Sequence, residues 1–262
     1  MKLIATILFV FCAASSAHAE PYVVAAIGDS ITAGFNADRI GNNRDLSWAT
    51  GMREDQMVLS HAHRIADYME QEVTARNVAI AGSQAKHLDR QINSLAESIP
   101  DYTTITIGAN DVCDWSEDYE DDIQRFEDDV DNAISRLVDI NDQMKIMLSP
   151  VPNIVNLRDV AVDKFGCQLI WDTIGICRPL LGRGRTDLER QQFAERLEAT
   201  NEALESVANR YPDQVLYERE LGEIEFAWAH VSGVDCFHPN VAGQNLYAEK
   251  TWQFGWFAHL TY

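Results

Sequence analysis

Short apolar runs alternate with amphipathic segments along most of the chain. A run of apolar and β-branched residues is typical of a strand that is buried on both faces of a sheet. Such runs predict strands at residues 23–27, 78–80, 104–107, 145–148 and 215–217. Between them, apolar residues recur every three or four positions, which is the spacing of one face of a helix. This spacing predicts helices at residues 56–72, 88–99, 123–137 and 186–209 and after Pro239.

The order of these elements predicts the fold class. Strands that alternate with helices form a mostly parallel sheet, and the helices cover both of its faces. The sequence therefore predicts an α/β protein with three αβα layers and about five strands. Ligands of such sheets bind beyond the carboxyl ends of the strands. We therefore expect the functional residues in the loops that follow the predicted strands.

The N-terminus differs in character from the rest of the chain. Lys2 precedes an apolar segment at residues 3–14, and the tripeptide 17–19 has small residues at both ends. This pattern is typical of a secretory signal peptide that is cleaved after Ala19. A membrane-spanning helix needs about 20 apolar residues, so the segment is too short for stable membrane insertion. We therefore expect a signal peptide at residues 1–19 and a secreted or periplasmic protein.

The remaining residues, 20–262, are expected to form one domain. They contain no internal repeat and no low-complexity linker, and 46% of the chain is hydrophobic. A chain of this length buries one substantial core.

Charge and motif spacing exclude several classes of partner. Acidic residues outnumber basic ones, 41 to 21, and the formal net charge is −20. Such a surface repels nucleic acids and anionic membranes. The densest acidic stretch, residues 117–131, lacks the glycine and the ligand spacing of an EF-hand, and is interpreted as a solvated helix face. No CxxC pair occurs, and Asp235 and His238 have no third ligand at a suitable spacing, so we expect no metal.

Removal of the signal peptide takes Cys12 with it and leaves four cysteines. An even number of cysteines in an exported protein indicates two disulfides, for which three connectivities are possible. In one of them Cys167 and Cys177 close a single loop, which leaves Cys113 and Cys236 to pair with each other.

Chemically useful residues follow three of the predicted strands and precede the last helix. The strands end in the segments 28–30 ("GDS"), 81–83 ("AGS") and 108–111 ("GAND"), and the late loop 234–240 reads "VDCFHPN". Together these segments hold a hydroxyl, an imidazole, a carboxylate, a side-chain amide and a glycine amide. Acyl transfer needs this set of groups.

The four blocks, in this order, resemble those of the SGNH (GDSL-type) hydrolase superfamily. The sequences around them ("LSWATG", "IGANDVCDW" and "VDCFHPN") are similar to those of the phospholipase B-like branch. The resemblance spans residues 28 to 238, almost the whole mature chain. It implies a flavodoxin-like parallel sheet and a cofactor-independent serine esterase or lipase that acts on lipid, phospholipid or simple acyl esters.

The resemblance also assigns roles. It implies that Ser30 is the nucleophile, His238 the general base and Asp235 the acid that orients the imidazole. The oxyanion hole would consist of the backbone N–H groups of Ser30 and Gly82 and the side-chain amide of Asn110.

Each of these residues also has a plainer interpretation. Ser30 alone would be taken as the cap of a following helix, His238 as a loop histidine and Asn110 as a turn residue. Asp29 and Asp111, beside the catalytic positions, are expected to hold their turns through side-chain bonds to the backbone.

If the "GAND" and "VDCFHPN" blocks converge, Cys113 and Cys236 would lie close together. We therefore expect a disulfide between them. Three aromatic residues, Phe35, Trp48 and Trp115, are candidates either for an acyl-binding site or for loop anchors.

The same motifs are compatible with three other functions. The first is a carbohydrate acetylesterase, the second is an acyltransferase that uses an acceptor other than water, and the third is a non-catalytic binding module of the same fold. The sequence leaves the oligomeric state open.

Overall fold

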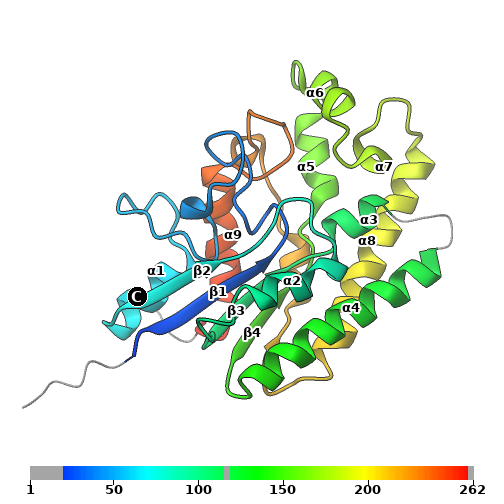
Figure 1. The fold of residues 1–262 in the computed structure, drawn as a ribbon. Coiled ribbons are helices and arrows are strands. Elements are labelled where there is room, and N and C mark those ends of the chain that lie inside the picture. The colour runs from blue at the N-terminus through cyan, green and yellow to red at the C-terminus, as the bar shows by residue number, and fades with distance from the viewer. Residues whose placement is uncertain (1–19, 115–118, 259–262) are drawn as a thin grey trace, which may run out of the picture.

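The computed structural model describes residues 20–114 and 119–258. The predicted signal peptide at residues 1–19 and Trp115 lie outside the described residues. Figure 1 shows the fold, with helices around a central sheet.

The sheet contains five parallel strands within the described residues. The strands are β1 (Tyr22–Gly28), β2 (Val73–Asn77), β3 (Tyr102–Thr106), β4 (Lys145–Ser149) and β5 (Val215–Leu216). Their order, β2-β1-β3-β4-β5, is that of flavodoxin-like doubly wound sheets. This confirms the predicted α/β fold.

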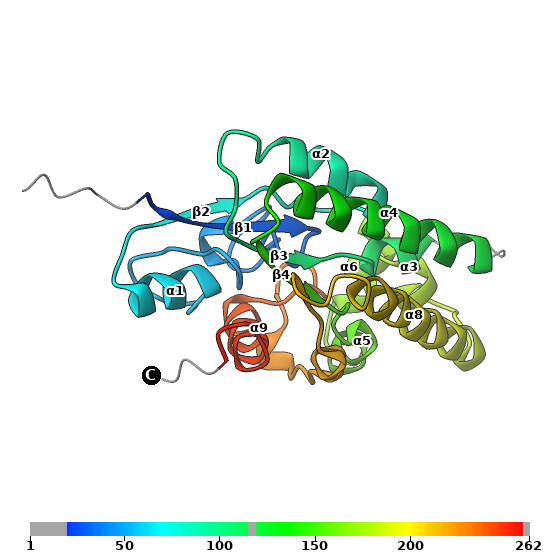
Figure 2. The same ribbon diagram turned by 90° about the horizontal axis from the view of Figure 1, so that it is seen from below.

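The α-helices of the described residues lie on both faces of the sheet and beyond the edge at which its strands end (Figure 1 and Figure 2). They are α1 (His61–Met69), α2 (Leu88–Asn93), α3 (Ala109–Asp114), α4 (Tyr119–Ile140), α5 (Ile154–Ala161), α6 (Cys167–Ile174), α7 (Arg178–Leu181), α8 (Asp187–Ala208) and α9 (Val241–Gln253). Figure 2 shows α2 and α4 on one face and α1 and α9 on the other. The central strands β1 and β3 are buried between these layers, which explains why their residues are mostly apolar in β1 and include the β-branched threonine and isoleucine in β3.

The register of the sheet determines where the loops begin. Gly28 of β1 pairs with Thr106 of β3, which in turn pairs with Ser149 of β4. The chain therefore leaves three neighbouring strands at the same edge. The segment that contains α5, α6 and α7 lies beyond this edge (Figure 1).

The second strand differs from the prediction. The strand is Val73–Asn77, and the apolar residues 78–80 that were expected to form it follow as loop. β2 lies at an edge of the sheet and its residues are only half-buried, so it contains polar residues and no long apolar run.

Two helices are shorter than the periodicity predicts. α1 begins at His61, not at residue 56, because Ser60 caps it by accepting a hydrogen bond from the backbone N–H of His63. α2 ends at Asn93, not at residue 99. Ser94 follows it and bonds back to a backbone carbonyl, which is one of the ways in which serine competes with a continuing helix.

The disulfide pairing also differs from the prediction. Cys113 is bonded to Cys177, and Cys167 is bonded to Cys236. The expected Cys113–Cys236 bridge, with Cys167 paired to Cys177, is therefore wrong. Helix α6 lies between Cys167 and Cys177, and eight helical residues span roughly 12 Å, which is too far for a direct bridge. Cys167, the first residue of this helix, is bonded to the loop before α9, and Cys177, three residues after its last residue, is bonded to α3.

Candidate active site

Ser30 is positioned by the end of strand β1. Gly28, its last residue, has a φ of 136°, and a Cβ atom there would lie 2.1 Å from the carbonyl oxygen of Thr106. Only glycine fits this close approach of β1 to β3. The turn that follows is held by Asp29, whose Oδ1 accepts a hydrogen bond from the N–H of Ile31.

No helix follows Ser30 directly; residues 30–36 form a series of turns. The interpretation of Ser30 as a helix cap is therefore wrong. Its hydroxyl oxygen lies 2.8 Å from Nε2 of His238, in a site where both residues are buried.

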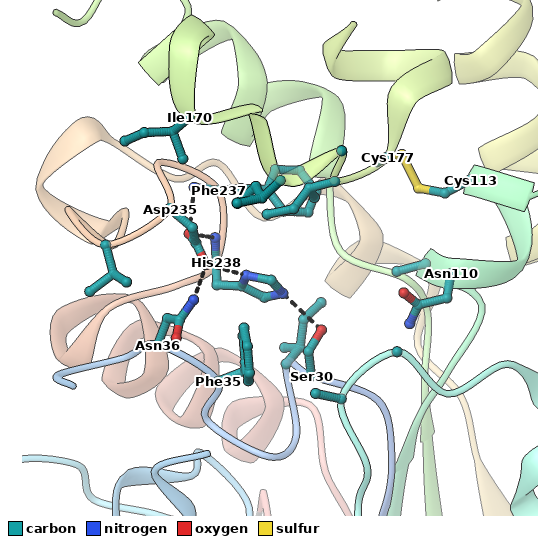
Figure 3. Close-up of a pocket in the computed structure, with 18 of the residues that line it drawn as sticks. Ser30, Phe35, Asn36, Asn110, Cys113, Ile170, Cys177, Asp235, Phe237 and His238 are labelled. Carbon is teal, nitrogen blue, oxygen red and sulfur yellow. Dashed lines mark hydrogen bonds and ion pairs between the residues drawn. A yellow bond between two sulfur atoms is a disulfide. The ribbon is translucent and has the colours of Figure 1, made fainter. Parts of the chain in front are cut away.

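His238 and Asp235 come from the loop that precedes α9. Nδ1 of His238 lies 2.6 Å from Oδ2 of Asp235. The other carboxylate oxygen, Oδ1, accepts hydrogen bonds from the backbone N–H groups of Phe237 and His238, each at 2.9 Å. In Figure 3 the imidazole lies between Asp235 and Ser30. The structure thus joins the three predicted residues into one hydrogen-bonded chain.

The surroundings of Asp235 hold it in its charged form. Burial by itself raises the pKa of a carboxyl group, but the contacts with His238, Asn36 and the backbone lower the pKa of Asp235 below its usual value. An ionised Asp235 can only accept hydrogen bonds, so the proton between the two residues lies on Nδ1 of His238. Nε2 is then the nitrogen that accepts from the Ser30 hydroxyl, which is the arrangement required of a general base.

The three predicted oxyanion donors line the same cavity. Gly82 has a φ of 80°, and a Cβ atom there would meet nothing within 4 Å, so conformation and not crowding favours glycine. In residues 20–114 and 119–258, the N–H groups of Ser30 and Gly82 donate to no protein acceptor. Nδ2 of Asn110 donates to the carbonyl oxygen of Ser83 at 2.9 Å. This bond uses one of the two amide hydrogens and leaves the other for a substrate.

Two buried carboxyl groups lie behind the site. Burial raises the pKa of Asp29 to about 7, against the lowering effects of the Ile31 N–H and of His238. Burial likewise raises the pKa of Asp111 to about 7, although this residue accepts hydrogen bonds from the Ala85 N–H. Asp29 therefore holds its own turn, as expected. Asp111 instead holds the loop that follows Gly82.

Asn36 and Gln91 support the site, although no sequence motif pointed to either residue. Nδ2 of Asn36 donates to Oδ2 of Asp235 at 2.6 Å, and Asn36 has a φ of 57°, a conformation that asparagine tolerates better than most residues. Gln91 accepts from the N–H of Gly28 and donates to its carbonyl oxygen and to Oγ of Ser83. The contacts of Asn36 with Asp235 and of Gln91 with Gly28 join segments that are 199 and 63 positions apart in the sequence, so no local motif points to them.

The cavity above Ser30 has a volume of about 990 Å³. This lies at the upper end of the range for small-molecule sites. Phe35 lines it and packs edge-on against His238, with ring centroids 5.2 Å apart. Trp48, the second aromatic candidate, is fully buried against His61 and Tyr247, so of its two candidate roles it has that of a loop anchor.

Among the described residues, no group of histidine, cysteine, aspartate or glutamate side chains is arranged to hold a metal ion. In the same part of the chain, no helix is both long and apolar enough to cross a membrane.

Comparison with protein families gives one match. A model of the GDSL-like lipase/acylhydrolase family matches residues 26–246. No curated protein sequence matches the chain.

Several solved structures share the fold. The crystal structure of TesA is 15% identical, covers 91% of this chain and 99% of its own, and superposes with a TM-score of 0.56. The psychrotrophic esterase EstA from Pseudoalteromonas sp., inhibited by monoethylphosphonate, is 12% identical, with coverages of 88% and 95% and a TM-score of 0.52. Axe2, an acetylxylan esterase from Geobacillus stearothermophilus, is 15% identical, with coverages of 88% and 93% and a TM-score of 0.52.

Proposed function

Because this chain belongs to the GDSL-like lipase/acylhydrolase family, we propose that it hydrolyses carboxylic esters through an acyl-enzyme intermediate on Ser30. The observation that carries the proposal is the buried chain from Ser30 Oγ through His238 to Asp235, with contacts of 2.8 and 2.6 Å. A serine hydroxyl is a weak nucleophile until an adjacent base takes its proton, and this arrangement supplies the base.

In the first half of the reaction, Ser30 Oγ forms a bond to the ester carbonyl carbon as its proton moves to Nε2 of His238. The carbonyl oxygen becomes an oxyanion and accepts hydrogen bonds from the N–H groups of Ser30 and Gly82 and from the Asn110 amide. Donors already aimed at the oxyanion stabilise it without reorganisation, and each contributes about 3–4 kcal/mol to such transition states. The carbon–oxygen bond to the alcohol then breaks, and the alcohol leaves with the proton from Nε2.

In the second half, water attacks the acyl-enzyme and gives a proton to Nε2. The second tetrahedral intermediate collapses, the carboxylic acid leaves, and Ser30 recovers its proton from Nε2. Asp235 stays ionised throughout and stabilises the imidazolium each time it forms. No cofactor enters either half.

The place of action is part of the proposal. The N-terminal pattern favours export with cleavage after Ala19, and the mature domain then comprises residues 20–262. Two disulfides support a secreted or periplasmic protein, because such bonds persist in oxidising compartments. The acidic composition favours neutral or zwitterionic esters over anionic lipid surfaces. The similarity of the motif sequences to the phospholipase B-like branch adds phospholipids to the candidates.

An active-site phosphonate and a series of p-nitrophenyl esters test the proposal. Wild type should be labelled once, at Ser30, and should hydrolyse at least part of the series from acetate to palmitate. Ser30→Ala should lose both labelling and at least about a thousandfold in kcat/KM. Wild type that is inactive on every ester and resists the phosphonate would leave the non-catalytic binding module as the better interpretation. Ester formation that dominates over hydrolysis when glycerol is added would identify an acyltransferase.

A further inference from the structure

Residues 167–177 form a segment that is bonded at one end to the loop of Asp235 and His238 and at the other to helix α3, which carries Asn110. Cys167 is bonded to Cys236, which follows Asp235 directly. Cys177 is bonded to Cys113, three residues after Asn110. The segment therefore extends over the site from the side of the triad acid to the side of the oxyanion donors. Figure 3 shows these two sides, with Ile170 above Asp235, and with Cys177 bonded to Cys113 on the side of Asn110.

The side of this segment that lines the cavity is apolar. Its larger members are Leu169, Ile170, Ile174 and Ile176. The polar side chains of α6 are engaged elsewhere. Gln168 donates to Asp172 and to the carbonyl oxygen of Leu181, and Asp172 pairs with Arg183. Thr173 lines the cavity, but its hydroxyl donates within the helix, to the carbonyl oxygen of Leu169.

The remaining polar side chains of the cavity already have roles in the proposed reaction. Among the described lining residues they are Ser30, Asn36, Asn110, Asp235 and His238. A carbohydrate needs further hydrogen-bonding side chains, because hydroxyls that lose water and find no partner cost free energy. An aliphatic chain needs none, and it gains free energy from the apolar area that it buries.

The direction of the acyl group follows from the proposed proton transfers. His238 protonates the departing alcohol, so the alcohol lies beside the imidazole, which Phe35 and Phe237 flank. The oxyanion points to Gly82 and Asn110. The acyl substituent therefore extends away from both the imidazole and the oxyanion donors, into the part of the cavity that the 167–177 segment lines.

We propose that the 167–177 segment is the acyl-binding wall and makes the enzyme selective for aliphatic acyl groups longer than acetyl. This inference rests on the proposed ester hydrolysis. The two disulfides, and a hydrogen bond of 3.1 Å from Trp171 Nε1 to the carbonyl oxygen of Asp235, hold the wall to the catalytic loops. Because the wall is held at both ends, selectivity depends on the size of the side chains that it presents to the cavity.

The test varies the acyl chain and keeps the p-nitrophenol leaving group constant. Ile174 lines the cavity and is 54% exposed, so the surface accommodates a larger side chain. We expect Ile174→Trp to lower the ratio of kcat/KM for octanoate to that for acetate by about tenfold or more, because it fills space that the longer chain uses. Leu169→Trp, also at an exposed position of the wall, should lower the same ratio.

Ile99→Trp is the matched control. Ile99 is 52% exposed and lies before β3, at the opposite edge of the sheet from the site. This variant should keep the wild-type ratio. A second series, acetate esters of alcohols from ethanol to octanol, tests the direction of binding, and its chain-length profile should be the same in Ile174→Trp as in wild type.

Three results would overturn the inference and leave ester hydrolysis in place. The first is an unchanged octanoate-to-acetate ratio in both wall variants. The second is wild type that prefers acetate or acetylated xylan to octanoate. The third is an Ile174→Trp variant whose chain-length profile changes for the acetate esters of different alcohols and not for the p-nitrophenyl esters. If wild type hydrolyses no ester and resists the phosphonate, the proposed function itself fails, and this inference fails with it.

Discussion

Asn36 donates a hydrogen bond of 2.6 Å to Oδ2 of Asp235, the same oxygen that faces Nδ1 of His238. The two residues are 199 positions apart in the chain. Ser232 strengthens the link, because its hydroxyl donates to the backbone carbonyl oxygen of Asn36. The loop after β1, which carries the serine, therefore also orients the carboxylate that orients the histidine. Asn36 acts through Asp235 and is a positioning residue.

Replacement of Asn36 should reduce activity without removing it. A hydrogen bond to a charged group contributes about 1.5–3 kcal/mol, so Asn36→Ala should lower kcat/KM by roughly ten- to a hundredfold. Loss of the bond also removes one of the contacts that lower the pKa of Asp235, so the part of the acidic limb of the pH–kcat profile that reports protonation of Asp235 should move to higher pH. Steady-state kinetics between about pH 4 and pH 9 measure both effects.

Asn36→Asp separates this role from simple packing. It keeps the size of the side chain but places a second carboxylate beside Asp235, so activity should fall further than in Asn36→Ala. Equal kinetics for wild type and Asn36→Ala would show that Asn36 does not position the triad.

Asn110 is expected to contribute mainly to the transition state. Removal of one oxyanion donor lowers kcat by about a hundred- to a thousandfold in comparable sites. Asn110→Ala should therefore reduce kcat far more than it changes KM, with a short-chain p-nitrophenyl ester as substrate. Thermal unfolding of the same variant should show a folded protein. The hydrogen bond that it loses, from Asn110 to the Ser83 carbonyl oxygen, is only partly buried, so its loss should cost little stability. An unchanged kcat would remove Asn110 from the oxyanion hole.

The stability of the protein should depend on the buried Asp29. Its pKa is raised to about 7 in the folded state, above its value of about 4 in an unfolded chain, so the folded state holds the proton more tightly. The free energy of unfolding should therefore fall as pH rises from about 4 to about 7. In Asp29→Asn, whose amide oxygen can still accept from the Ile31 N–H, the fall should be smaller by an amount on the order of a few kcal/mol.

Urea unfolding at about pH 4, 5.5 and 7 measures this dependence. Asp38→Asn is the control, because Asp38 is exposed and its replacement should leave the wild-type dependence unchanged. Asp111, with its pKa also raised to about 7, should keep part of the dependence in Asp29→Asn. A parallel pH dependence in wild type and Asp29→Asn would contradict the assignment.

The two disulfides should differ in their effect on catalysis. Both close long loops, of 64 and 69 residues, so removal of either should cost about 2–5 kcal/mol of stability. The Cys167→Ala/Cys236→Ala variant loosens the loop of Asp235 and should lower kcat on all esters. The Cys113→Ala/Cys177→Ala variant frees the other end of the acyl wall and should weaken the preference for octanoate over acetate. Chemical unfolding and the p-nitrophenyl ester series measure the two effects. Identical changes in kcat and in the octanoate-to-acetate ratio in both variants would refute these separate roles of the two disulfides.

Local sequence determined most of the strands, the boundary of one long helix and the positions of the catalytic motifs. The runs of apolar and β-branched residues predicted β1, β3 and β4 closely, because a strand that is buried on both faces of a sheet has few polar positions. Thr186 and Glu189 form a capping box at the start of α8, so the boundary of that helix is also encoded locally. The motifs carrying Ser30, Asp235 and His238 were visible because each follows a strand or precedes a helix.

The tertiary structure decided what depends on distant segments. Strand β2 has no apolar run because all of its residues are only half-buried, and its position follows from pairing with β1. Asn36 gains its role only when the loop after β1 meets the loop before α9. The disulfide pairing depended on α6, which separates Cys167, bonded to the loop of Asp235, from Cys177, bonded to helix α3. Periodicity and motifs report the local environment of a residue, whereas its partner across the fold depends on how the elements pack.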